Sequence, residues 1–189
     1  RIKTEKEKLI KEGKIKRDKN ESYIYQGDDK NYYEKINGKV VNITDEIPFD
    51  IPKNWCWNKL KNISFITKLA GFEFTEYICP NLQVYGIPLF KGKNIQNDKI
   101  IYNFESFIPL EISNKLKRSQ ITKKCLLTPY VGSIGNIAIH NKSGMFHLGS
   151  NVGKIELHNN LNINILEEYV FYYLKSYSGF LELSKFKKA

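Results

Sequence analysis

The chain has 189 residues, of which 41% are hydrophobic and 13% are aromatic, which is typical of one folded domain with appendages and excludes an intrinsically disordered chain. It contains no run of about 18 apolar residues and no apolar signal segment, so we expect neither a membrane partner nor secretion. The 30 basic and 20 acidic residues give a net charge of +10, which favours a polyanionic partner such as nucleic acid, although a lysine-rich composition can also reflect genomic bias.

The first 46 residues predict a helix followed by a hairpin. Residues 1–19 carry nine basic and four acidic side chains, place Leu9 and Ile10 near one helical stripe, and are interpreted as the end of a basic spacer helix. A basic arm that binds phosphate is the alternative. Within 20–46, two alternating runs flank Asn37-Gly38, a pair suited to a type I′ turn, and predict an appendage that contains a hairpin.

Residues 47–189 form the main predicted domain, which begins with an extended, proline-rich segment at 47–52. Trp55 and Trp57 would share one face of a strand and are expected to anchor a core, with base stacking as the alternative. Several prolines and glycines break the segment 71–92, which therefore predicts a loop with short strands.

The second half of this domain alternates short strands and helices. Pro109 predicts the first turn of a short helix in which Ile112 and Leu116 share a face. The other predicted elements are a buried strand at 125–128, a tight turn at 132–135, strands at 136–139 and 152–157, and a helix at 166–175 that Asn164 could cap. The elements together predict a mixed α+β fold of the α/β class, in which short helices flank an irregular, mostly antiparallel sheet preceded by a helix end and a β-hairpin.

The residues that usually carry catalysis do not form a recognisable pattern. His140, His147 and His158 lack the spacing of metal ligands, and the acidic residues are scattered rather than clustered. The three cysteines are odd in number and widely spaced, which is typical of free thiols in a reducing cytoplasm. We therefore expect a cytoplasmic, non-catalytic protein without a metal or cofactor.

Several segments resemble, in order, the target recognition domain of the DNA specificity subunit of type I restriction-modification systems. Loop-rich stretches at 70–78 and 86–94 interleave aromatics, glycines, lysines and amides. The more specific motifs are Glu5–Lys14 (spacer-helix end), Pro48–Trp57 (domain start), Leu126–Asn136 (glycine turn), His147–Val152 (closing strand) and Glu168–Leu174 (closing helix). Each motif is weak singly, but together they span essentially the whole chain.

The resemblance implies a module that reads one half of a bipartite site in double-stranded DNA, with methyltransferase (modification) and restriction subunits as partners. It also implies that 1–19 ends the spacer helix before a recognition domain, probably the second one. The chain departs from the family pattern because it stops before the next spacer helix, so dimerisation and recruitment of methyltransferase subunits stay open.

Polar residues on loops are the candidates for contacting DNA, since lysines neutralise phosphates while amides, hydroxyls and arginine can read base edges. We rank two loops first and a scattered set second. The first loop contributes Lys91, Lys93, Asn94 and Gln96, and the second contributes Lys117, Arg118, Ser119, Gln120 and Thr122, while Tyr130, Ser133, His147, Ser150 and Asn151 rank behind them.

Two alternatives stay open beside the DNA specificity module. The chain could be the recognition domain of a single-chain restriction-modification enzyme, or it could be a general nucleic-acid-binding domain that follows charge and ignores base sequence.

Overall fold

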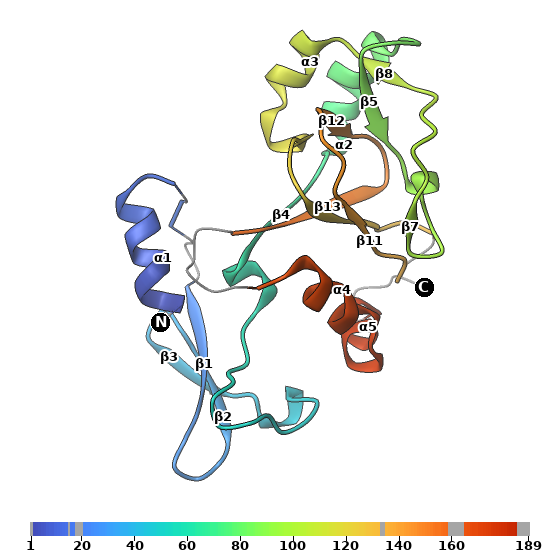
Figure 1. Ribbon diagram of the computed structural model, residues 1–189. Coiled ribbons are helices and arrows are strands. Elements are labelled where there is room, and N and C mark those ends of the chain that lie inside the picture. The colour runs from blue at the N-terminus through green and yellow to red at the C-terminus, as the bar shows by residue number, and fades with distance from the viewer. Residues whose placement is uncertain (1, 15, 18–20, 133–134, 159–164, 185–189) are drawn as a thin grey trace. The chain divides into compact units, whose positions relative to one another are not determined.

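The computed structural model describes the chain except for residues 1, 15, 18–20, 133–134, 159–164 and 185–189 (Figure 1). Two compact units divide the chain and are described separately. The first consists of Arg1–Ser64 and His158–Asn164, and the second consists of Phe65–Leu157 and Ile165–Ala189. The separate prediction that 1–19, 20–46 and 47–189 form a spacer end, an appendage and a recognition domain stays a prediction.

The first unit combines helix α1 (Ile2–Lys11) with a three-stranded antiparallel sheet in the order β1-β2-β3. The strands are β1 (Ser22–Gln26), β2 (Tyr32–Ile36) and β3 (Lys39–Asn42). The turn between β2 and β3 has φ of 47° at Asn37 and 85° at Gly38, as a type I′ turn requires. Ile36 pairs with Lys39 across it, so the predicted hairpin is confirmed.

The tryptophans of the first unit depart from their predicted place in a strand. Residues 51–59 form no strand, and Trp55 is 54% exposed, so the prediction of a core anchor is wrong for Trp55. Trp57 is half-buried and meets Phe49 edge to face, with ring centroids 5.0 Å apart. Pro48 and Pro52 keep this segment irregular, so the two indole rings do not share a strand face.

The second unit contains two four-stranded sheets (Figure 1). The first has the order β11-β10-β13-β4 and is formed by β4 (Ser64–Lys68), β10 (Cys125–Pro129), β11 (Ala138–His140) and β13 (Val152–Leu157). The second has the order β8-β5-β12-β9 and is formed by β5 (Ile87–Phe90), β8 (Phe107–Ile108), β9 (Gln120–Ile121) and β12 (Phe146–Leu148). A short ribbon pairs β6 (Ile95–Gln96) with β7 (Lys99–Ile100).

Short helices complete the second unit. They are α2 (Gly71–Glu73), α3 (Leu110–Lys115), α4 (Glu167–Lys175) and α5 (Tyr177–Ser184). The predicted helices at 108–112 and 166–175 are thus confirmed, although Leu166 precedes α4 as its N-cap and Asn164 lies outside the described residues. The predicted turn at 132–135 is only partly described, with positive φ at Gly132 and Gly135.

The segment 71–81 is helical, so its prediction as a loop is wrong. α2 continues into a π-helical turn at Phe74–Ile78 and a 3-10 turn at Cys79–Asn81. Pro80 lies near the start of the last turn, where its missing N–H is not needed, so it does not break the helical path. Ile78 is fully buried and fastens this segment to the core.

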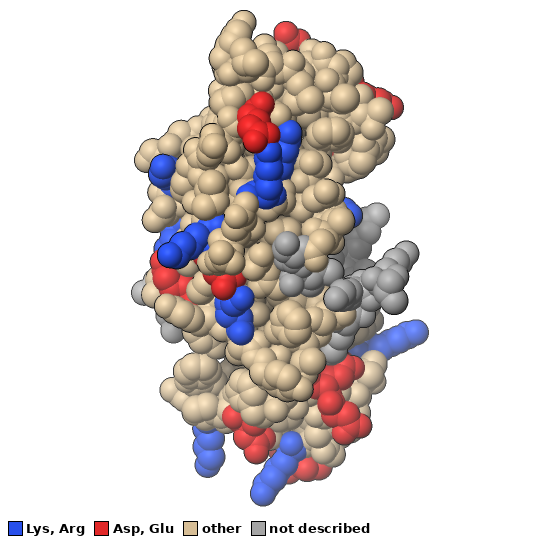
Figure 2. Space-filling model, turned by 90° about the vertical axis from the view of Figure 1, so that its right-hand side faces the viewer, with Lys and Arg blue, Asp and Glu red and all other residues tan. Residues whose placement is uncertain are grey.

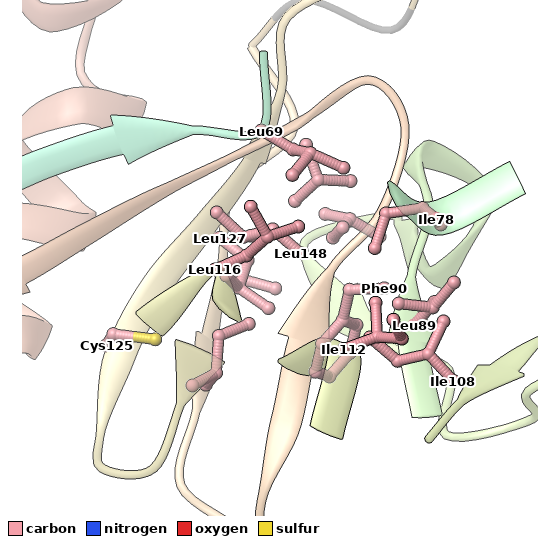
Figure 3. Close-up of a cluster of buried hydrophobic side chains, with 14 residues drawn as sticks. Leu69, Ile78, Leu89, Phe90, Ile108, Ile112, Leu116, Cys125, Leu127 and Leu148 are labelled. Atoms are coloured by element: carbon pink, nitrogen blue, oxygen red, sulfur yellow. The ribbon is translucent and has the colours of Figure 1, made fainter. Parts of the chain in front are cut away.

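The core of the second unit draws its side chains from both sheets and from α3 (Figure 3). Phe90, Leu127 and Leu148 are fully buried at its centre, and Ile112 and Leu116 contribute the apolar face predicted for α3. Each such side chain contributes roughly 1.5–3 kcal/mol through burial. Most strand pairings are antiparallel, with β5 and β12 parallel, so the predicted mixed α+β class with a mostly antiparallel sheet is confirmed.

Candidate nucleic-acid interface

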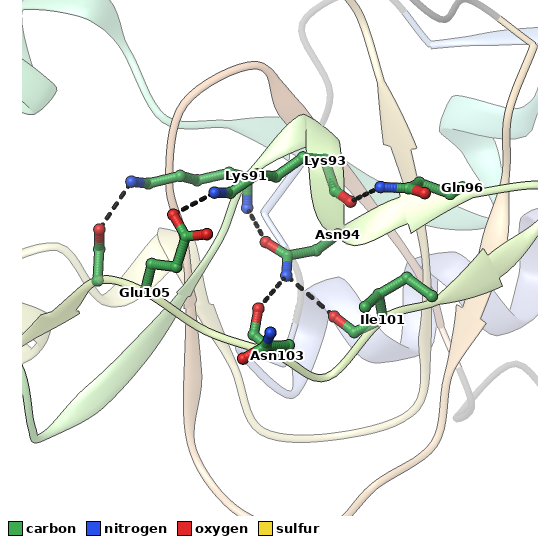
Figure 4. A network of polar contacts seen from close by, with 8 residues as sticks. Lys91, Lys93, Asn94, Gln96, Ile101, Asn103 and Glu105 are labelled. Atoms are coloured by element: carbon green, nitrogen blue, oxygen red, sulfur yellow. Dashed lines mark hydrogen bonds and ion pairs between the residues drawn. The ribbon is translucent and has the colours of Figure 1, made fainter.

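The first loop (Lys91–Gln96) follows β5 and is closed by the side chain of Asn94 (Figure 4). Asn94 is 2% exposed. Its Oδ1 accepts the Lys91 N–H at 2.9 Å, and its Nδ2 donates to the carbonyls of Ile101 at 2.9 Å and Asn103 at 3.0 Å. This amide therefore shapes the loop from inside.

Two lysines of the first loop point away from this buried amide (Figure 4). Nζ of Lys91 donates to the Ser106 hydroxyl at 2.7 Å, and Lys93 forms an ion pair with Glu105. The hydrogen bond from Lys93 lowers the pKa of Glu105. Both partners of this pair are exposed, so solvent screens it and a phosphate can replace Glu105 at little cost.

Tyr130 and Asn151 lie beside the first loop, although they are distant in sequence. The Tyr130 N–H donates to the Asn151 carbonyl at 3.2 Å, at the end of the β10–β13 pairing. A Cβ built on Gly92 would lie 3.9 Å from Cβ of Asn151, so this part of the loop passes close to that residue. Asn151 is exposed, with φ of 64°, a left-handed conformation that asparagine tolerates.

Lys68, at the end of β4, joins this group and was missed by sequence reasoning. Its Nζ lies 4.6 Å from the centroid of the Tyr130 ring. Nothing in the local sequence marks Lys68, because the contact depends on the pairing of strands far apart in the chain. We refer to Lys68, Lys91, Lys93, Tyr130 and Asn151 as the interface cluster.

The second loop (Lys117–Thr122) centres on Arg118, which is held by two other segments. Its guanidinium contacts Glu73 at 2.5 and 3.3 Å and the hydroxyl of Thr67 at 3.2 Å. Burial alone would raise the pKa of Glu73, but the hydrogen bond from Arg118 outweighs it together with the Ala70 amide and the charge of Arg118, so the pKa lies below its usual value. Arg118 thus ties its loop to α2 and to Thr67, the neighbour of Lys68.

The other residues of the second loop divide into buried and exposed ones. Ser119 is fully buried. Nε2 of Gln120 donates to the carbonyl and hydroxyl of Ser113, each at 3.1 Å, so its amide supports α3. Lys117 and Thr122 are exposed and are available to a ligand.

Of the remaining candidates, His147 is fully buried in β12, and its Nδ1 lies 2.7 Å from the Leu148 carbonyl. Burial lowers its pKa. Ser150 is half-buried next to Asn151, and Gln96 is exposed, with Nε2 donating to the Lys93 carbonyl at 2.7 Å. Ser133 lies outside the described residues.

The charged side chains do not form one uninterrupted basic surface. Figure 2 shows Lys and Arg side chains with acidic side chains beside several of them. The ion pairs of Lys93 with Glu105 and of Lys123 with Glu156 follow this pattern. The interface cluster therefore offers a few mobile cations together with Tyr130 and Asn151, a mixture suited to contacting both phosphates and bases.

The described residues contain no group of three or more His, Cys, Asp or Glu side chains placed to hold a metal ion. Burial raises the pKa of the Cys125 thiol to about 12, which keeps it protonated and unreactive. Among the described helices, none combines the length and apolar character needed to cross a bilayer.

Comparisons with known proteins reveal similarity at the level of the fold. No family model matches the chain, and no curated protein matches it. The HsdS subunit from Thermoanaerobacter tengcongensis shares its fold over 75% of this chain, with a TM-score of 0.51 and 15% identity. A second structure, described as the structural basis of complex assembly and conformational transition of the type I R-M system, covers 74% with a TM-score of 0.50 and 16% identity.

The chain spans about a third of the length of each of these structures, with 32% and 31% of their residues covered. The matches cover most of this chain, including more than its second unit alone could supply, since that unit holds Phe65–Leu157 and Ile165–Ala189. The resemblance seen in the sequence motifs is therefore confirmed at the level of structure: the chain has the fold of part of a type I restriction-modification HsdS specificity subunit.

Proposed function

We propose that the chain recognises a short sequence in double-stranded DNA and reads one half of a bipartite target for a type I restriction-modification complex. The observation that carries the proposal is the fold shared with the HsdS subunit over 75% of the chain. The interface cluster adds suitable chemistry, because it joins lysines to an exposed amide and a tyrosine on loops held by two sheets.

In this proposal the roles within the cluster differ. Lys68, Lys91 and Lys93 neutralise phosphates and fix the register on the duplex. Asn151 and Tyr130 face base edges, where an amide can pair with adenine and a hydroxyl with several bases. Lys117 and Thr122 extend the contact along the second loop. Asn94, Ser119 and His147 are buried, so they support these loops and are left out of the contact.

The same proposal assigns the parts of the chain. Residues 47–189 act as the recognition domain, probably a second one, while 1–19 end a spacer helix and 20–46 form its appendage. Catalysis belongs to partners, namely a methyltransferase (modification) subunit and a restriction subunit, and the assembly works in the cytoplasm. A single-chain enzyme with fused catalytic domains would use the same interface.

Selection of bound duplexes from a random library, at about 50 and 200 mM salt, tests this function. We expect a short enriched motif. Asn151→Gly removes the amide but keeps the left-handed backbone, so it should relax the motif at one position while affinity for other positions is kept. Lys93→Ala should instead weaken binding to all duplexes alike.

Tyr130→Phe serves as a matched variant, because it removes the hydroxyl and keeps the ring that Lys68 contacts. A change in the motif with Tyr130→Phe would assign the hydroxyl to base reading. Salt-sensitive binding without any enriched motif, under both conditions, would contradict sequence-specific recognition and favour general affinity for polyanions.

A further inference from the structure

A second exposed surface lies at one end of the second unit and differs in character from the interface cluster. Four apolar side chains form it, and we refer to them as the end surface. They are Leu82 (41% exposed), Val84 (83%), Tyr85 (72%) and Leu110 (53%). Exposed apolar side chains that lie close together mark interaction sites more often than isolated ones do.

The two segments of the end surface are held side by side by backbone pairing. Gln83 exchanges two hydrogen bonds with Phe107, at 3.0 and 3.1 Å, and Ile87 pairs with Ile108. Leu110 follows at the start of α3. The loop that carries Val84 and Tyr85 is therefore anchored on both sides of its tip.

Gly86 makes this anchoring tight. Its φ is 112°, and an added Cβ would lie 2.6 Å from the Ile108 carbonyl oxygen. The backbone approach thus requires glycine, which fixes how the preceding Val84 and Tyr85 leave the sheet. A loop held in this way presents its side chains with little entropy left to lose on binding.

The charge around the end surface excludes a polyanion as its natural ligand. The segments 69–90 and 100–114 contain no Lys or Arg, in a chain with 30 basic residues. Glu76 and Glu111 are exposed on these segments, and Lys115, which follows, pairs with Glu111 at 2.9 Å. Figure 2 likewise shows acidic but no basic side chains at the upper extremity of the view. Phosphates would be repelled here, whereas a basic protein surface would be attracted.

We propose that the end surface docks a protein partner, the methyltransferase subunit of the same complex, through an apolar recess flanked by Lys or Arg. The identity of the partner rests on the function proposed above. The rigid apolar tip fills the recess, while Glu76 and Glu111 face the flanking cations. DNA and this partner then occupy separate surfaces of the second unit.

The test measures the affinity of the full chain for the purified methyltransferase subunit by titration calorimetry, and its affinity for duplex DNA in parallel. Val84→Ser combined with Tyr85→Ser should weaken subunit binding at least about tenfold, because central aromatic anchors dominate interfaces. DNA affinity should stay within twofold. Leu181→Ser is the matched control, since Leu181 is an exposed apolar residue (45%) on α5 and should change neither affinity.

A charge variant adds a second readout. Glu76→Lys with Glu111→Lys should weaken subunit binding at low salt and lose that effect at high salt. Unchanged subunit binding in both double variants, or no binding by the unaltered chain, would overturn the proposed docking. The DNA selection described above is independent of this result, so the proposed function would then stand or fall separately.

Two further outcomes would assign the end surface to another ligand. Loss of DNA affinity in the Val84/Tyr85 variant, with subunit binding kept, would make the tip a DNA-contacting wedge and overturn the proposal. Self-association of the chain in sedimentation velocity that disappears in this variant would show that a second copy covers the surface, and it would also overturn the proposal.

Discussion

Asn94 illustrates how a polar residue of a recognition loop serves the loop itself. Its side chain makes three hydrogen bonds to backbone groups while almost fully buried. These bonds satisfy the Lys91 N–H and two carbonyls that would otherwise be stranded away from water. The positions of Lys91 and Lys93 therefore depend on a residue that cannot itself reach a ligand.

Replacing Asn94 by Ala should lower the free energy of unfolding by about 2–3 kcal/mol, because several buried backbone groups lose their partners. Gln96→Ala, in the same loop, is the control and should change it by no more than about 0.5 kcal/mol, since Gln96 is exposed. Urea denaturation of the full chain measures both. Equal effects in the two variants would show that the network of Asn94 does not stabilise the loop.

The sequence predicts which residue types could contact DNA better than it predicts which of them are free to do so. Arg118 and Gln120 have the chemistry of base readers, yet Glu73, Thr67 and Ser113 engage their polar atoms. Those partners lie up to 51 residues away, so no local pattern could reveal them. Lys68 was missed for the same reason.

Elements with strong local signals were predictable. The Asn37-Gly38 hairpin and α3 after Pro109 each rest on a backbone requirement that a few neighbouring residues meet. The segment 71–81 was not, because its helical turns are stabilised by tertiary burial of Ile78 rather than by helix-favouring residues. The irregular course around Trp55 likewise depends on prolines whose effect on the next strand cannot be read locally.

Gly86 supports a sharp test at the level of strand pairing. Gly86→Ala should lower the free energy of unfolding by about 1–3 kcal/mol, because φ is positive and the new Cβ meets the Ile108 carbonyl. Gly71→Ala is the matched control. Its Cβ would enter open space at the first residue of α2, so stability should stay the same or rise slightly. A neutral Gly86→Ala in thermal unfolding would contradict the tight β5–β8 approach.

The neighbouring segments β11 and β12 each carry a buried histidine, which makes stability depend on pH. Burial lowers the pKa of both His140 and His147, so the folded chain holds them neutral. The unfolded chain protonates them near pH 6.5, and below that value stability should fall by up to about 1.4 kcal/mol per pH unit for each histidine. The carboxylates with lowered pKa, such as Glu73, act only at more acidic pH.

Urea denaturation between pH 7 and pH 5 measures this slope. His147→Gln should flatten it, because one of the two protonation differences is removed, even if the variant is less stable at pH 7. A slope equal to that of the unaltered chain would show that His147 titrates alike in the folded and unfolded states.

At the scale of the molecule, the second unit separates two kinds of surface. The interface cluster gathers lysines from β4 and from the first loop, whereas the end surface lies on segments without Lys or Arg. A net charge of +10 would attract DNA to any basic region, so charge alone cannot direct the duplex. The lack of cations at one end limits where phosphates can lie.

This polarity predicts how DNA affinity depends on salt. The plot of log K against log salt concentration should lose about 0.9 of its slope in Lys93→Ala, because one phosphate contact disappears. Lys115→Ala should keep the full slope, since Lys115 lies beside the end surface and pairs with Glu111. Glu105→Gln should strengthen binding by releasing Lys93 from its ion pair. Fluorescence anisotropy at several salt concentrations gives all three slopes, and equal losses for Lys93→Ala and Lys115→Ala would mean that the duplex does not distinguish the two surfaces.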